Sequence, residues 1–149
     1  MLSVAELMTR EPYTLGPANS LAEARQLMAE HHIRHIPVVS GEGCLIGLVS
    51  HRDLLAAADS TVLAEQRGVT ATENYVAISS IMTSPVQTVD EQAGLRGTAM
   101  HLQKNKLGCL PVVREGRLVG IITDSDFVAI AISLMEQLEA SEPDEFDFD

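Results

Sequence analysis

Two stretches of this chain, the first repeat (about residues 4–54) and the second repeat (about 78–128), carry the same residues in the same order. The shared positions are a Met-Thr pair, a Pro-Val-Val triplet, a glycine and an aspartate: Met8-Thr9 with Met82-Thr83, Pro37-Val38-Val39 with Pro111-Val112-Val113, Gly47 with Gly120, and Asp53 with Asp126. Prolines, glycines and apolar runs seldom align together by chance over such a length. The chain is therefore built from two similar halves.

Each repeat predicts an extended segment (residues 13–15 and 86–89), a helix, two short strands and a second helix, a β-α-β-β-α unit. In the first repeat, Ser20 and Glu23 form the S-x-x-E pattern of a capping box, which predicts the start of the first helix. The β-branched runs 36–39 and 45–49 are joined by a glycine-bearing segment, as in a hairpin. The expected fold class is mixed α/β.

A single repeat is too short to bury much apolar surface, so we expect the two repeats to pack together about a pseudo-twofold axis. The segment between them has mixed composition and is expected to extend a helix and then cross to the second half. The predicted organisation is a first unit, a linker, a second unit and an acidic tail, with boundaries 1–58, 59–77, 78–139 and 140–149.

Charge narrows the range of partners. The chain carries 21 acidic and 10 basic residues, a formal net charge of -11. Residues 136–149 hold seven of those acids and no base, so the acidity is largely a property of the C-terminal end. The excess of negative charge argues against nucleic acid and against an anionic membrane surface as partners.

Cysteine content and the N-terminal sequence indicate the compartment. Cys44 and Cys109 are too few for a disulfide framework or a zinc ribbon. The start of the chain lacks the basic and apolar stretches of a signal peptide, and no apolar run is long enough to span a membrane. We therefore expect a cytoplasmic protein.

The repeated motifs resemble the CBS domain, the family named from cystathionine β-synthase. The pattern of Met-Thr, then Pro-Val-Val, then a glycine followed by apolar residues and [ST]-x-x-D occurs once in each repeat. The resemblance implies a regulatory module without a required cofactor, which binds AMP, ADP, ATP or S-adenosylmethionine in a cleft between the repeats. It also implies a homodimer and an effector protein that receives the signal.

The motifs Ser50-x-x-Asp53 and Thr123-x-x-Asp126 stand where a strand turns into a helix. Free backbone N–H groups and the helix dipole favour an anion at such a place, and a carboxylate there can accept the two ribose hydroxyls. The same spacing is also that of a helix capping box. Both interpretations stay open, and the two roles are compatible.

The two repeats differ in charge around these motifs. The first repeat places four basic residues there, whereas the matching positions of the second repeat hold neutral or acidic ones: Arg34, His35, His51 and Arg52 against Gly108, Cys109, Asp124 and Ser125. In the family, basic residues near the position of Arg34 often hold phosphates. We therefore expect unequal clefts, with phosphorylated nucleotides preferred in the cleft that contains Asp53.

The resemblance also implies an adenine slot, formed by the residues around the first strand and before Pro-Val-Val. The matching positions are Pro12, Tyr13, Ile33, Pro85, Val86 and Leu107. Together with the motif residues, the predicted nucleotide-binding set comprises Pro12, Tyr13, Ile33, Arg34, His35, Ser50, Arg52, Asp53, Pro85, Val86, Leu107, Gly108, Thr123, Ser125 and Asp126. Each apolar member of the set could equally be ordinary packing.

Two other functional classes are compatible with parts of the sequence. A constitutive dimerisation or scaffold module would carry the same repeats with vestigial clefts. A metal-dependent hydrolase would use His31, His32 and His35, but the helix is expected to end there, which spoils the i, i+4 geometry of zinc ligands. No nucleophile motif is present, so we predict neither an enzyme nor a metal site. The acidic tail with Phe146 and Phe148 is expected to be a solvated end or a docking peptide.

Overall fold

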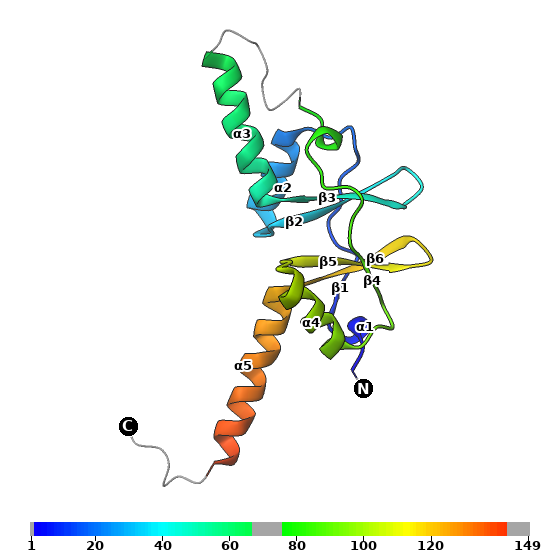
Figure 1. The fold of residues 1–149 in the computed structure, drawn as a ribbon, viewed down its shortest axis with the longest axis vertical. Coiled ribbons are helices and arrows are strands. Elements are labelled where there is room, and N and C mark those ends of the chain that lie inside the picture. Colours follow the sequence, from blue (N-terminus) through cyan, green and yellow to red (C-terminus); the bar gives the residue numbers. More distant parts are fainter. Residues whose placement is uncertain (1, 67–75, 143–149) are drawn as a thin grey trace.

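The computed structural model of the chain describes residues 2–66 and 76–142, and its mixed α/β architecture confirms the predicted fold class. The first half contains α1 (Val4–Leu7), β1 (Thr9–Arg10), α2 (Leu21–His31), β2 (His35–Val39), β3 (Leu45–Ser50) and α3 (His51–Gln66). The second half contains η1 (Ile78–Ser80), β4 (Val89–Asp90), α4 (Leu95–Asn105), β5 (Cys109–Arg114), β6 (Arg117–Thr123) and α5 (Asp124–Ser141). Figure 1 shows the two halves one above the other.

Two sheets lie next to each other in the middle of the molecule (Figure 1). One has the strand order β1-β6-β5-β4, with β4 parallel to β5 and the other pairs antiparallel. The other is the β2-β3 hairpin, extended by single bridges from Leu15 to Val38 and from Thr83 to Leu48. The predicted opening strands are therefore shorter than expected, because only Leu15 pairs in the first repeat and β4 begins at Val89.

The Met-Thr segments are exchanged between the two halves. In the first half, β1 pairs with β6 of the second half, Thr9 opposite Ile121. Met8 packs so closely on Gly120 that a Cβ atom added to Gly120 would lie 2.5 Å from Sδ of Met8. Met82 packs in the same way on Gly47, at 2.3 Å. Each half therefore completes its core with a segment from the other.

Two short helical turns anchor this exchange. They are α1 and η1, which occupy equivalent places in the two repeats and were not predicted as elements. Val4 and Ile78 are completely buried, and each lies in the hydrophobic cluster of the opposite half. The N–H of Val4 donates to the carbonyl of Ala93 at 2.8 Å. Hydrophobic packing therefore crosses the boundaries drawn from the sequence repeat.

The helix termini follow local sequence signals. The Ser20 hydroxyl accepts from the Glu23 N–H at 3.1 Å, which is the first half of the predicted capping box. The Glu23 carboxylate accepts from the side-chain amide of Asn19 in place of the Ser20 N–H, so the second half of the box was predicted wrongly. Helices α2 and α4 occupy equivalent places in the two repeats, and each ends at a residue in the left-handed conformation. These residues are His32, with φ 54°, and Lys106, with φ 53°. Helix α5 reaches Ser141, so the acidic stretch begins inside this helix. Both phenylalanines of the tail lie outside the described residues.

No helix in the described part of the chain has the length and apolar character needed to cross a membrane.

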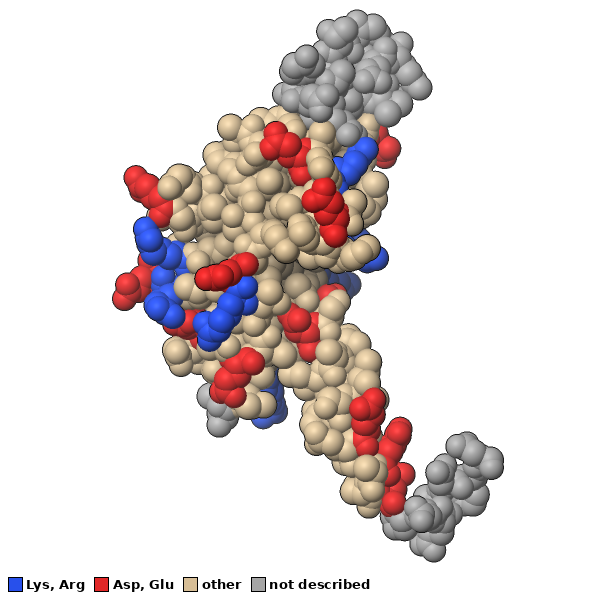
Figure 2. Space-filling view, turned by 180° about the vertical axis from the view of Figure 1, so that it is seen from behind, with Lys and Arg blue, Asp and Glu red and all other residues tan. Residues whose placement is uncertain are grey.

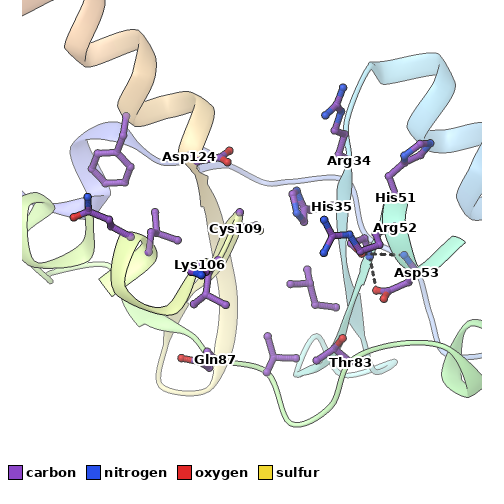
Figure 3. A pocket seen from close by; sticks show the side chains of 18 of the residues that line it. Arg34, His35, His51, Arg52, Asp53, Thr83, Gln87, Lys106, Cys109 and Asp124 are labelled. Atoms are coloured by element: carbon purple, nitrogen blue, oxygen red, sulfur yellow. Dashed lines mark hydrogen bonds between the residues drawn. The ribbon is translucent and has the colours of Figure 1, made fainter. Parts of the chain in front are cut away.

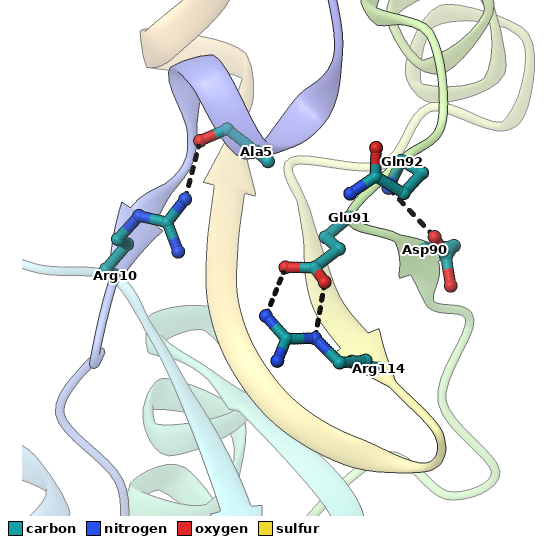
Figure 4. Close-up of polar contacts among 6 residues, drawn as sticks. All are labelled: Ala5, Arg10, Asp90, Glu91, Gln92 and Arg114. Atoms are coloured by element: carbon teal, nitrogen blue, oxygen red, sulfur yellow. Dashed lines mark hydrogen bonds and ion pairs between the residues drawn. The ribbon is translucent and has the colours of Figure 1, made fainter.

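Glu91, which follows β4, forms an ion pair with Arg114 at the end of β5 (Figure 4). Glu91 is only 7% exposed, and its two carboxylate oxygens accept from the guanidinium of Arg114. The backbone carbonyl of Glu91 also accepts from the N–H of Ala5 at 2.9 Å. The hydrogen bond from Arg114 lowers the pKa of Glu91 below its ordinary value of 4.5.

We expect Arg114→Gln to lower the free energy of unfolding at neutral pH. In acid, the difference in stability between the variant and the wild type should disappear. Because the pKa of Glu91 is lowered in the folded state, its stabilisation is present above about pH 4.5 and disappears as the pH falls through the lowered pKa. The measurement is the urea midpoint of wild type and variant at pH 7 and pH 3. Arg117→Gln is the control, because Arg117 donates to the carbonyl of Glu42, which does not titrate, at 2.8 Å. A midpoint difference at Arg114 that persists unchanged in acid would contradict this account.

Candidate functional site

A cavity of about 960 Å³ lies between the two halves, with both contributing to its walls. Nine of the fifteen predicted site residues line it: Arg34, His35, Ser50, Arg52, Asp53, Pro85, Val86, Leu107 and Gly108. Figure 3 shows Arg34, His35, Arg52 and Asp53 on one wall and Cys109, Lys106 and Asp124 on the opposite wall. The Ser50-x-x-Asp53 motif of the first repeat and the Pro85-Val86 segment of the second repeat therefore line the same cavity.

The remaining six predicted residues do not line this cavity: Pro12, Tyr13, Ile33, Thr123, Ser125 and Asp126. From the symmetry of the two repeats, we expect them to lie around the motif of the second repeat. One of them is Tyr13, whose ring stacks on His31 at 3.8 Å between centroids, with an interplanar angle of 15°. Their proposed part in binding a ligand stays a prediction.

Six polar or charged lining residues were missing from the predicted set: His51, Thr83, Gln87, Gln103, Lys106 and Asp124. Lys106 follows the last residue of α4, where its left-handed conformation ends the helix beside the cavity. Aligning the repeats places Lys106 opposite His32, which has nearly the same backbone angles. A basic residue at both positions was the signal in the sequence that could have identified Lys106.

The [ST]-x-x-D motifs form capping boxes in both repeats. In the first, the Ser50 N–H donates to Oδ2 of Asp53 at 2.9 Å, and the Asp53 N–H donates to the Ser50 hydroxyl at 3.1 Å. In the second, the Thr123 N–H donates to Oδ2 of Asp126 at 2.8 Å. The capping role is therefore established. A carboxylate has about four lone-pair sites, so capping through one oxygen leaves acceptor capacity for a ligand.

His35 joins the two walls of the cavity. Its Nε2 would lie 3.2 Å from a Cβ placed on Gly108, and Oδ2 of Asp124 would lie 3.8 Å from the same point. Glycine at position 108 therefore makes room for the imidazole. Burial lowers the pKa of His35, and the nearby carboxylates of Asp124 and Asp53 oppose that effect only in part.

The lining of the cavity carries more positive than negative charge, although the chain as a whole is acidic. Arg34 and Arg52 come from the first half and Lys106 from the second, and Figure 3 shows all three around the space. Asp53 and Asp124 are the acids of the lining. Three permanent cations against two carboxylates, one of them engaged in a cap, make the cavity suited to an anionic ligand.

A cysteine and two histidines lie in or near the site. Cys109 lines the cavity, but burial raises the pKa of its thiol to about 12, which suppresses the nucleophilic thiolate. His31 is the last residue of α2 and stacks on Tyr13, whereas His35 begins a strand. Within residues 2–66 and 76–142, no group of three or more His, Cys, Asp or Glu side chains is placed to hold a metal ion.

The family model for the CBS domain matches this chain twice, at residues 4–60 and 78–133. The chain belongs to the CBS domain family. The two matches cover both repeats and form a tandem pair, as the sequence predicted, and CBS pairs are regulatory modules.

Solved structures of CBS pairs share the fold. A Vibrio cholerae protein assigned to acetoin utilization (AcuB) is 47% identical, with a TM-score of 0.79, over 96% of this chain and 99% of its own. CBSX2 of Arabidopsis thaliana in complex with AMP is 26% identical, with a TM-score of 0.74, over 91% and 99% of the two chains. The CBS pair of MJ0100 in complex with 5′-methylthioadenosine and S-adenosyl-L-methionine is 26% identical, with a TM-score of 0.76, over 89% and 98%. CBS pairs similar to this one therefore bind adenosine compounds.

CBS pairs also form parts of longer proteins. The homoserine O-acetyltransferase of Methanocorpusculum labreanum is 33% identical to this chain over 141 residues. The match covers 93% of this chain and 25% of the enzyme. This chain therefore spans about a quarter of that relative, so the activity of the whole enzyme is not transferred to this CBS pair.

Proposed function

We propose that this CBS pair is a cytoplasmic regulatory module that binds an adenine nucleotide in the cavity between its halves and passes the signal to an effector protein. The observation that carries the proposal is the cavity itself, which is lined by three cations from both halves together with Asp53. The complexes of CBSX2 with AMP and of MJ0100 with S-adenosyl-L-methionine support an adenosine ligand.

The lining suggests how a nucleotide would be held. The Asp53 carboxylate would accept the ribose hydroxyls, and Arg34, Arg52 and Lys106 would bind the phosphates. Pro85, Val86 and Leu107 offer apolar surface for the adenine ring. Because three cations line the cavity, AMP, ADP or ATP should bind more tightly than S-adenosylmethionine, which carries no phosphate.

Signalling would follow from linkage. A nucleotide that contacts both halves favours one relative orientation of the halves, and an effector that distinguishes the orientations is then regulated. We propose that the module acts as a homodimer and has no catalytic activity of its own. The similarity to AcuB suggests a search for the effector among the proteins of acetoin utilization.

A scaffold module is the second candidate. The capping hydrogen bonds of Asp53 and Asp126 favour it, because helix capping alone would account for the shared motif. Such a module would dimerise without responding to nucleotides.

Calorimetric titration of the full chain with AMP, ADP, ATP and S-adenosylmethionine tests the proposal. We expect one site per chain for the phosphorylated ligands, and a stabilisation of about 2.7 kcal/mol at a ligand concentration a hundred times its Kd. The absence of heat and of thermal shift with all four would favour the scaffold. Two equal sites would contradict the unequal clefts.

A further inference from the structure

Two histidines line the cavity between the halves, and their surroundings differ. Histidine is the side chain whose charge ordinarily changes between about pH 5 and 8. His51 begins α3 and is exposed, whereas His35 begins β2 and is half-buried. The charge of a half-buried group depends more strongly on its neighbours, because less water screens them. His35 is therefore the histidine whose protonation responds to what enters the cavity.

The imidazole of His35 reaches the backbone of the second half. Figure 3 shows it on the wall of the first half, on the side that faces Cys109 and Asp124. Its Nε2 would lie 3.2 Å from a Cβ on Gly108, and Oδ2 of Asp124 would lie 3.8 Å from the same point. The N–H of Asp124 donates to the carbonyl of Gly108 at 3.0 Å, which fixes this side of the contact. The ring therefore lies where the two halves meet.

Charged groups face His35 from several elements. Burial lowers the pKa of His35, and Arg34 beside it has the same effect, whereas Asp124 of α5 and Asp53 of α3 raise it. Burial has the largest effect, so the pKa lies below its ordinary value of 6.5 and the ring is mostly uncharged at pH 7. The other titratable or charged residues of the lining are Cys109 on β5, Lys106 after α4, and His51 and Arg52 on α3.

Many of the acids that give the chain its negative charge lie away from this contact. Figure 2 shows acidic side chains along the far end of α5. Glu136 follows Asp124 by twelve residues, which is about 18 Å along a helix. The Debye length at physiological ionic strength is about 8 Å, so such charges are largely screened from His35. The residues of the cavity therefore set its charge state.

A phosphate in the cavity would shift this balance toward the protonated ring. A phosphate monoester carries about −1.5 to −2 charges at pH 7. An opposite charge within about 4–6 Å favours the charged form of a titratable group, so such a ligand raises the pKa of His35. Linkage is reciprocal, and protonation of His35 therefore strengthens the binding of the phosphate by the same factor.

We propose that His35 takes up a proton when a phosphorylated adenine nucleotide enters the cavity, so that nucleotide binding by this module is coupled to pH. The inference rests on the proposed function, because it places the nucleotide in the cavity of Asp53. It also makes His35 a residue that selects ligands by charge. Adenosine has the same base and ribose but no phosphate, so its affinity gains nothing from the proton.

The affinity for the nucleotide should increase in acid. The pKa of His35 lies below 6.5 before binding and rises when the phosphate arrives. Above the raised pKa the ring is uncharged in both states, and the affinity doesn't depend on this group. As the pH falls between the two pKa values the affinity increases, and it levels off below the lower one.

Isothermal titration calorimetry with AMP, at pH values from about 8 to about 5.5, tests the coupling on the full chain. The affinity of the wild type divided by that of His35→Gln is expected to rise at least about threefold as the pH falls over this range. The phosphate of AMP itself titrates at about pH 6, but that contribution is the same for both proteins and cancels in the ratio. A ratio that stays constant or falls would overturn the inference.

His51→Gln is the matched control, because His51 lines the same cavity but is exposed to solvent. The ratio of wild type to this variant should stay constant within about twofold, as expected for an exposed charge. An equal rise with both variants would assign the coupling to the whole cavity and overturn the role of His35.

NMR titration of the His35 ring needs no variant, so it decides the question even where a substitution impairs folding. Saturating AMP is expected to raise the pKa of the ring, and saturating adenosine is not. An unchanged pKa with AMP, or an equal rise with adenosine, would contradict the coupling.

The same titrations separate this inference from the proposed function. Binding of AMP with a constant ratio between wild type and His35→Gln would leave a nucleotide sensor without proton coupling. No binding of AMP, ADP or ATP at any pH in the range would refute the proposed function and the inference with it.

Discussion

Asp53→Ala is expected to weaken adenine nucleotide binding at least about 100-fold, because two hydrogen bonds from ribose to a charged carboxylate are worth about 1.5–3 kcal/mol each. Asp53 lines the cavity between the halves, beside Arg52 and Ser50. Isothermal titration calorimetry with AMP and ATP measures the effect. The loss should be similar for both ligands, since they share the ribose.

Asp126→Ala is the matched control for this variant. Asp126 occupies the same place in the second repeat and makes the same capping bond, 2.8 Å to the Thr123 N–H against 2.9 Å between Ser50 and Asp53. Each substitution should therefore cost about 1 kcal/mol of stability through the lost cap. Only Asp53 lines the described cavity, so only Asp53→Ala should lose the ligand.

The pair of variants separates the two roles of the motif. Equal stability losses with unequal binding losses would assign ribose recognition to Asp53 in addition to capping. Nucleotide affinity that survives Asp53→Ala would show that the motif serves the helix alone. An equal loss of affinity in both variants would place ligands in both clefts and contradict the predicted inequality.

The sequence predicted the local elements because their signals are local. The hairpin between residues 36 and 49 follows from β-branched runs flanking a glycine segment, and it is present as β2 and β3. The start of α2 follows from Ser20, whose hydroxyl caps the helix. Strand ends were less accurate, since Val86 and Gln87 line the cavity, whereas β4 begins only at Val89. Pairing with β5 decides that boundary, and the isolated segment contains no sign of it.

The exchange of Met-Thr segments couldn't be predicted from the repeats. Met8 would satisfy the same pattern whether it packed on Gly47 in its own half or on Gly120 in the other. Pseudo-symmetry makes the two choices look identical in an alignment, and only the three-dimensional connection distinguishes them. The exchange has a direct consequence for the site. Thr83 follows Met82 into the first half, pairs with Leu48, and so brings Pro85 and Val86 to the cavity of Asp53.

The same reasoning explains which candidate residues converge. The predicted set was drawn from both repeats at once, but a single cavity takes the motif from one repeat and the first-strand segment from the other. Ser50 and Asp53 are therefore joined by Pro85 and Val86, and not by Pro12. Lys106 was missed because its contribution depends on where α4 ends relative to the opposite wall.

Gly120→Ala is expected to destabilise the protein by about 3 kcal/mol and Gly47→Ala by about 1 kcal/mol, the range for overpacking a tight site. A Cβ on Gly120 would lie 2.9 Å from the backbone carbonyl of Thr9, which the β1–β6 pairing holds in place. The three atoms nearest to a Cβ on Gly47 would all belong to the side chain of Met82, which is half-buried and whose end can rotate away.

Urea unfolding of both variants measures this difference, and Gly97→Ala is the control, because nothing lies within 4 Å of a Cβ at Gly97 in α4. The control should gain about 0.5–1 kcal/mol, as alanine does over glycine inside a helix. Gly→Ala also reduces the entropy of the unfolded chain by a similar amount at all three positions, so that contribution cancels in the comparison. Equal losses at Gly47 and Gly120 would mean that the backbone of β1 yields as readily as a methionine side chain. Strand β1 would then be only weakly held against β6, and the two halves could move relative to each other without disrupting their shared hydrophobic packing.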